Sequence, residues 1–200
     1  MDAFSFSADE TANFSNKNIR LLKDIPVDDF SSLLSIYKYL NLSNNNLTVI
    51  DGDFINKFVN ICFLNVSSNK ITKIQGIELL RNLQFLDVSN NEIAVIESMG
   101  NCNETLEKLM ASHNNINSIF FNTIMNKLEY IDIRENRINK LSFGKFVPHL
   151  HTLKVDNNFL NDISGLSDFD ELEVFSASSN QITEIPKLSK FALRTINLSN

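Results

Sequence analysis

The sequence has few of the residues that build catalytic and metal sites. Its five glycines are scattered, so no glycine-rich loop is available to hold a phosphate group. The three histidines are His113, His149 and His151, and no second cluster of ligands accompanies them, which argues against zinc. The sequence therefore predicts a protein that is not an enzyme and that uses no cofactor or metal.

The chain also has little cysteine and no long apolar run. Cys62 and Cys102 are the two cysteines, and two unrelated thiols suit a reducing compartment. No stretch of about 20 apolar residues predicts a membrane span. The first ten residues lack the basic and apolar regions of a signal peptide. We therefore expect an intracellular, cytoplasmic protein.

Positive charge is the third scarcity. With 18 Lys and Arg against 24 Asp and Glu, the formal net charge is −6, and no run of Lys or Arg occurs. Binding to a phosphate backbone needs a basic face. The charge therefore argues against a nucleic-acid partner.

Instead, one sequence motif is repeated along the length of the chain. Between residues 83 and 96 three apolar residues are spaced as in a short strand, and an asparagine and further apolar residues follow. The recurring asparagines are Asn45, Asn69, Asn91, Asn114, Asn136, Asn158 and Asn180. They are 24, 22, 23 and then three times 22 residues apart. A fixed period in the low twenties indicates a solenoid of stacked repeats.

Each copy of the motif predicts a short strand with one buried face. Because side chains alternate across a strand, Leu86 and Val88 point to one face and Asp87 to the other. Parallel stacking of the copies would build a continuous core. The predicted core pairs are Leu40/Leu42, Leu64/Val66, Leu86/Val88, Leu109/Ala111, Ile131/Ile133, Leu153/Val155 and Phe175/Ala177.

The recurring asparagines, named here the Asn ladder, predict a structural role. An asparagine amide both donates and accepts, which suits it to bond the backbone that leaves each strand. Loss of one ladder residue would leave buried backbone groups unpaired, at a cost of about 1–3 kcal/mol.

From about residue 37 to 200 the repeated motif resembles that of the leucine-rich-repeat family. Residues 69–83 and 163–172 resemble its short intracellular subclass. The resemblance implies an α/β solenoid. A curved parallel β-sheet would form the concave face, and short helical or 3-10 turns and loops the convex face. Known members of the subclass regulate a type-one protein phosphatase, belong to a spliceosomal particle, or act at centrosomes and cilia. Secreted members usually carry disulfide-rich ends, which this sequence lacks.

We expect two parts in the chain. Residues 1–36 form an N-terminal extension and cap, and residues 37–200 form seven full repeats with a truncated eighth. The cap contains a degenerate first repeat with Lys17 at the ladder position, and residues 28–34 are predicted to form a short helix. In the eighth repeat Leu193, Ile196 and Leu198 take core positions, so self-association through this edge is an open alternative.

Phenylalanines in the connections between strands are predicted to form a second apolar layer rather than a ligand pocket. These residues are Phe54, Phe58, Phe120, Phe143, Phe146, Phe169 and Phe191.

The outward strand positions predict a binding surface on the concave face. Aromatic residues dominate its first part, and mixed charges gather around the fourth to sixth repeats, where they would set the register of a partner. The predicted partner-binding residues are Tyr39, Phe63, Phe85, Asp87, Lys108, Met110, Tyr130, Asp132, Arg134 and Lys154. The aromatic pairs would equally suit simple stabilisation of the sheet.

Two main functions remain open from the sequence. The first is a non-catalytic intracellular module that recruits or scaffolds one protein partner, as the N-terminal region of a larger centrosomal, cytoskeletal or signalling protein. The second is a homo-oligomerisation unit. A phosphatase-regulatory subunit, an extracellular recognition ectodomain and the front part of an effector enzyme are further alternatives.

Overall fold

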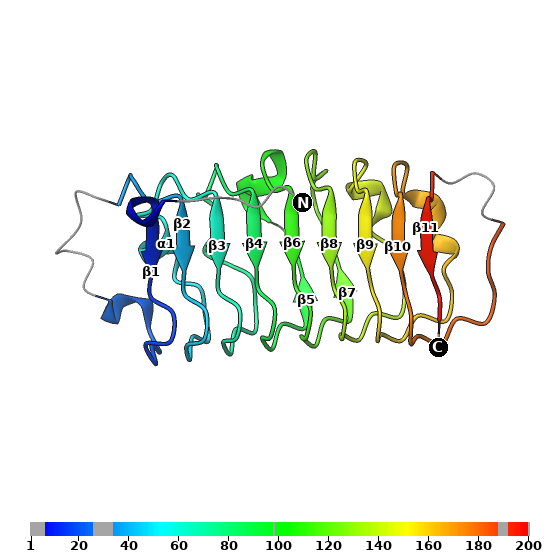
Figure 1. Cartoon of the computed structure of the whole chain (residues 1–200), viewed down its shortest axis with the longest axis horizontal. Helices are drawn as coiled ribbons and strands as arrows, with labels where there is room; N and C mark the ends of the chain where they lie inside the picture. The colour runs from blue at the N-terminus through cyan, green and yellow to red at the C-terminus, as the bar shows by residue number, and fades with distance from the viewer. Residues whose placement is uncertain (1–6, 26–33, 98, 188–191, 200) are drawn as a thin grey trace.

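The computed structural model describes residues 7–25, 34–97, 99–187 and 192–199. Within these residues nine strands lie side by side in one parallel sheet along the long axis of the molecule (Figure 1). The strands are β1 (Thr11–Asn13), β2 (Tyr39–Asn41), β3 (Phe63–Asn65), β4 (Phe85–Asp87), β6 (Lys108–Met110), β8 (Tyr130–Asp132), β9 (Thr152–Lys154), β10 (Val174–Ser176) and β11 (Thr195–Asn197). The predicted solenoid is confirmed.

The register of the sheet aligns equivalent positions of successive repeats. Tyr39 pairs with Phe63, which pairs with Phe85, and the same alignment continues to β11. The middle residue of each strand from β2 to β10 is fully buried, as are the predicted core partners two positions later. Full burial of each such Leu, Ile or Val contributes about 1.5–3 kcal/mol. The predicted core is therefore confirmed.

Short turns connect the strands on the convex side, because a repeat of about 22 residues leaves little chain for longer helices. The helical turns are η1 (Ala8–Glu10), η2 (Leu22–Asp24), α1 (Gly52–Ile55), η4 (Gly100–Glu104), η5 (Gly144–Phe146) and η6 (Ser164–Asp168). β5 (Val95–Ile96) and β7 (Ser118–Ile119) pair in a second, two-stranded sheet. None of the helices within the described ranges is long and apolar enough to span a membrane.

The predicted layer of phenylalanines is confirmed in part. Phe54, Phe58, Phe143 and Phe169 are buried. The prediction is wrong for Phe120 and Phe146, which are 62% and 37% exposed. Phe191 lies outside the described residues.

Alternation along the chain explains the error at Phe120. Ile119 and Phe121 are both buried, so Phe120 between them points to the opposite side of an extended segment. Phe143, which precedes η5, is buried, whereas Phe146, the last residue of η5, is partly exposed. Sequence spacing alone did not separate the inward from the outward ring.

The residue before each ladder asparagine has a left-handed backbone conformation. Its φ lies between 53° and 55° in all seven repeats. Asparagine tolerates this conformation better than most residues, and Asn44, Asn90 and Asn157 follow that preference. Ser68 and Ser179 occupy the same position, although serine lacks this tolerance for the left-handed conformation.

We expect Ser68→Asn to raise the free energy of unfolding by about 0.5–1 kcal/mol, because it relieves part of the left-handed penalty. Urea denaturation measures the change. The reverse substitution Asn90→Ser should lower stability by a similar amount. A destabilising Ser68→Asn would show that backbone conformation does not limit this turn.

The two ends of the sheet differ. β1 pairs with β2 in the common register, and the ladder asparagine Asn45 accepts from the backbone N–H groups of Lys17 and Ile19. At the other end all three residues of β11 are exposed, and Ile196 is 37% exposed.

Residues 28–33 of the predicted helix lie outside the described part of the chain.

Candidate functional site

The Asn ladder joins every repeat to the one before it. The Asn91 side-chain amide donates to the carbonyl oxygens of Val66, Val88 and Ser89 at 3.0–3.2 Å, and its Oδ1 accepts from the Ile71 N–H at 2.9 Å. The other six members, Asn45, Asn69, Asn114, Asn136, Asn158 and Asn180, make the same set of bonds.

Neighbouring ladder residues share their acceptors. The carbonyl oxygen of Val88 accepts from both Asn91 and Asn114, at 3.0 Å each. Because both amide hydrogens and the oxygen of each ladder residue are used within the solenoid, these residues serve the fold and leave nothing for a ligand.

A second set of side chains caps the turn that follows each strand. The last residue of β2, Asn41, accepts from the backbone N–H of Ser43 at 3.1 Å, and Asp87 accepts from Ser89 at 2.9 Å. Such a bond, in which the side chain mimics a backbone turn, favours Asn and Asp. The bond recurs at Asn13, Asn65, Asp132 and Asn197.

Three strands of the nine-stranded sheet end in a residue that does not supply this cap: Met110 in β6, Lys154 in β9 and Ser176 in β10. Methionine and lysine side chains are poor or absent acceptors. The fold therefore does not explain why Met110 and Lys154 stand at these positions, and both lie beside Asp132 in the sheet register.

Arg134 covers the end of β8. Its Nε lies 2.9 and 3.1 Å from the two oxygens of Asp132, and its Nη2 lies 2.7 Å from Oδ2. The Asp132 side chain is 0% exposed, whereas that of Arg134 is 45% exposed. The hydrogen bond to Asp132 raises the pKa of Arg134. Asp132, which we predicted as a partner-binding residue, thus lies beneath Arg134 and holds the guanidinium in place.

Asp156 replaces the cap that β10 lacks. Its Oδ1 accepts from the Ser178 N–H at 2.8 Å, and from the hydroxyls of Ser176 at 2.6 Å and Ser178 at 2.5 Å. Burial raises the pKa of Asp156, but these hydrogen bonds outweigh it and the net shift is downward. The sequence did not predict this role. An aspartate at a position where other repeats carry serine was the available signal.

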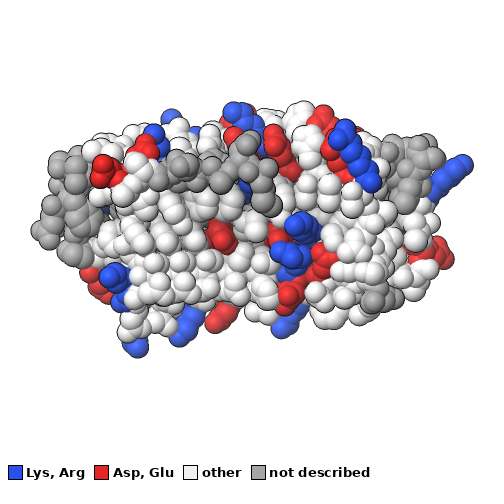
Figure 2. Space-filling view, in the orientation of Figure 1, with Lys and Arg blue, Asp and Glu red and all other residues white. Residues whose placement is uncertain are grey.

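Charged groups meet in a shallow cavity on this face. The ammonium group of Lys154 lies 5.5 Å from the centre of the Tyr130 ring, a cation–π contact. The cavity, about 350 Å³, is lined by residues that include Arg134, Glu135, Lys154, Asp156, Ser176 and Ser178. Figure 2 shows basic and acidic side chains side by side around β8 on the sheet.

The aromatic residues of the predicted surface pack chiefly on one another. The rings of Phe63 and Phe85 stack with centroids 4.0 Å apart, and Tyr39 meets Phe63 edge-on at 4.5 Å. All three are half-buried. Lys108 of β6 separates this row from Tyr130. The structure therefore divides the predicted surface into an aromatic part over β2–β4 and a charged part over β6–β10.

Asp87 has an unfavourable position for a charge. Burial raises its pKa, the bonds to Ser89 lower it, and the charge of Asp132 raises it, with a net upward shift. Asparagine would make the same cap, as Asn41 and Asn65 do, without a charge.

We therefore expect Asp87→Asn to stabilise the fold at neutral pH. Below the pKa of unfolded aspartate both states are protonated, and the variant gains nothing from the missing charge. As the pH rises through the unfolded and then the folded pKa, ionisation favours the unfolded wild type, so the advantage of the variant grows. Urea denaturation between pH 3 and pH 8 measures this difference. An advantage that shrinks as the pH rises would contradict the assignment.

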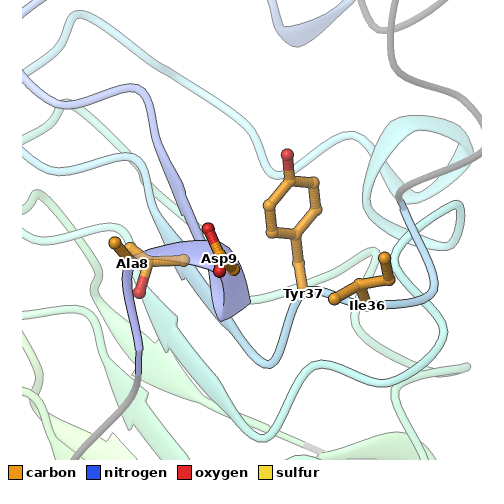
Figure 3. Close-up of a pocket in the computed structure, with 5 residues that line it drawn as sticks. Ala8, Asp9, Ile36 and Tyr37 are labelled. Atoms are coloured by element: carbon orange, nitrogen blue, oxygen red, sulfur yellow. The ribbon is translucent and has the colours of Figure 1, made fainter.

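Another cavity, of about 450 Å³, lies at the N-terminal end between η1 and the segment before β2. Figure 3 shows its labelled residues Ala8, Asp9, Ile36 and Tyr37. Among the described residues that line it, Asp9 is the one carboxylate, and they form no catalytic combination of groups. Across the described ranges, no group of three or more His, Cys, Asp or Glu residues could hold a metal ion.

Part of the chain is similar to a known family of repeats. Residues 18–93 match the family model described as leucine rich repeat. No curated protein sequence matches the chain.

Three solved structures illustrate the likeness of fold. The leucine-rich repeat domain of APL1B aligns with a TM-score of 0.72 at 19% identity, covering 96% of this chain and 70% of its own. The LRIM1/APL1C complex gives 0.65 at 23% identity, covering 82% of this chain and 28% of that one. The TLR13–ssRNA13 complex gives 0.75 at 23% identity, covering 91% and 27%. This chain spans less than a third of the last two.

Proposed function

We propose that this chain, a leucine-rich-repeat protein, is a non-catalytic module that binds one protein partner on the concave sheet face over β6–β10. The leucine-rich-repeat fold commonly mediates protein–protein interaction, which supports the proposal at the level of the fold.

Met110 and Lys154, the last residues of β6 and β9, do not supply a turn cap, and this supports a binding role for the face. Six strands use their last residue for the fold, whereas these two present half-buried side chains that no turn requires. Arg134 likewise stands where most repeats have serine. Arginine and methionine are enriched in interfaces between proteins. Side chains that the fold does not need, gathered on one face, favour a recognition role.

A protein fits this face better than a nucleic acid does. The formal net charge is −6, and around β8 the basic side chains are mixed with acidic ones. A phosphate backbone would meet Glu135 and Asp156 beside every basic group there. We therefore do not extend the RNA complex of TLR13 to this chain.

The test uses a random dodecapeptide library displayed on phage and selected on the full chain. Enriched peptides are synthesised with a fluorophore, and their Kd is measured by anisotropy on the wild type, Met110→Arg and Leu79→Arg. Leu79 is an exposed apolar residue in the connection between β3 and β4, which makes it a matched control. We expect Met110→Arg to weaken binding at least tenfold and Leu79→Arg less than twofold. Equal binding to all three proteins would contradict the proposal.

Self-association is the second candidate, and the exposed strand β11 favours it. Ile196 is 37% exposed, whereas its equivalents from β2 to β10 are fully buried. Light scattering over a wide concentration range would show a mass that rises from 22.8 kDa toward twice that value. Ile196→Lys should then abolish the rise. A constant mass would remove this candidate.

We also propose that this chain binds its partner in an intracellular setting. More specific centrosomal, cytoskeletal or phosphatase-linked roles are proposals as well. The state of the two cysteines supports the intracellular setting. Cys62 and Cys102 are both free thiols.

A further inference from the structure

Resting on the proposed function, we propose that the cavity lined by the turn after β8 and by residues of β9, β10 and β11 receives an aspartate or glutamate side chain of the protein partner, between Arg134 and Lys154.

The acidic groups of the cavity already have partners within the described chain. Asp132 is covered by Arg134, and Asp156 accepts three hydrogen bonds from Ser176 and Ser178. Glu135 lies 2.9 Å from the ring of His113. None of these carboxylates needs a cation from a ligand to be satisfied.

The two basic groups keep unused donors. Among the described residues, Lys154 has the Tyr130 ring as its neighbour and no ion pair. Arg134 uses Nε and Nη2 on Asp132, which leaves the Nη1 hydrogens for another acceptor. Because nearly half of the Arg134 side chain is exposed and its orientation is fixed, a carboxylate could bind without reordering it.

A single negative charge suits the cavity better than a phosphate group. Glu135 and Asp156 line the same space, so each added negative charge meets repulsion as well as attraction. A carboxylate brings one charge, and a phosphate brings nearly two at neutral pH. We therefore assign the cavity to an acidic side chain rather than to a phosphorylated one.

The experiment uses the peptides selected on the full chain, with Lys154→Gln as the test variant. Arg134→Gln is unsuitable alone, because it would leave the buried Asp132 charge unpaired and could unfold the chain. Lys57→Gln, an exposed lysine in the connection between β2 and β3, is the matched control for the lost charge. For each peptide, the acidic residue is changed to its amide and, separately, to phosphoserine.

We expect the selected peptides to share an acidic position. Lys154→Gln should weaken them at least tenfold, Lys57→Gln less than twofold, and the amide peptide should bind both variants alike. Peptides that lose binding to Met110→Arg but ignore Lys154→Gln would overturn this inference and leave the proposed function standing. Peptides that ignore both variants would overturn both. Tighter binding of the phosphoserine peptide would overturn the assignment to a carboxylate.

Discussion

Phe143→Ala is expected to lower the free energy of unfolding by about 4 kcal/mol, the range for removing a buried aromatic ring from a core. The Phe143 ring meets Phe121 edge-on at 6.1 Å and Phe169 edge-on at 5.4 Å. Because these rings belong to three successive repeats, the cavity left by alanine would loosen two repeat interfaces at once. Urea denaturation followed by circular dichroism measures the loss.

Phe146→Ala is the matched control for this prediction. It removes the same ring three residues away, from a position that is partly exposed. We expect a loss within about 1 kcal/mol, as for most changes outside the core. Similar losses for the two variants would show that the convex aromatic layer is not organised around Phe143.

Asn114→Ala is expected to cost about 3 kcal/mol. The alanine leaves the buried N–H of Ile93 without the Asn114 Oδ1 that it contacts at 3.0 Å, at about 1–3 kcal/mol, and it removes three further bonds. The carbonyl oxygens that lose the Asn114 amide keep other donors, because Asn91 still donates to Val88 and Asn136 still donates to Ala111. This sharing keeps the expected loss below the sum of four hydrogen bonds.

The neighbouring asparagine offers a control of the same chemistry. Asn115 is half-buried, and its backbone N–H bonds the Ile93 carbonyl whatever its side chain. Asn115→Ala should therefore change stability by less than about 0.5 kcal/mol. If Asn115→Ala cost as much as Asn114→Ala, the ladder would not be the source of the effect. Binding of the selected peptides should be unchanged by either substitution at a temperature where both variants are folded.

The parts of the fold that follow from the period could be predicted from the sequence. Alternation along a three-residue strand places Leu86 inward and both Phe85 and Asp87 outward, and stacking repeats that assignment in every copy. The ladder follows in the same way, since an asparagine at a fixed place in each repeat always meets the same backbone groups. Periodicity carries this information because each repeat contacts only its neighbours.

What escaped prediction depends on contacts that break the period. Phe120 and Phe121 are neighbours in an extended segment, and the sequence does not reveal which of the two faces the core. Asp132 occupies an outward position yet is buried, because Arg134 two residues later folds over it. Asp156 reaches into the next repeat to replace a missing cap. The surface proposed for binding consists largely of such departures, so the repeat pattern located it without giving its geometry.

Photo-crosslinking shows whether the partner binds the concave face over β6–β10. A photoreactive phenylalanine analogue is placed at Met110 in one protein and, as a control, at the exposed Ile124 between β7 and β8 in another. Each protein is irradiated with a selected peptide, and the adduct is mapped by mass spectrometry. We predict an adduct from position 110 and none from position 124. An adduct from position 124 with none from position 110 would mean that the partner binds elsewhere on the protein.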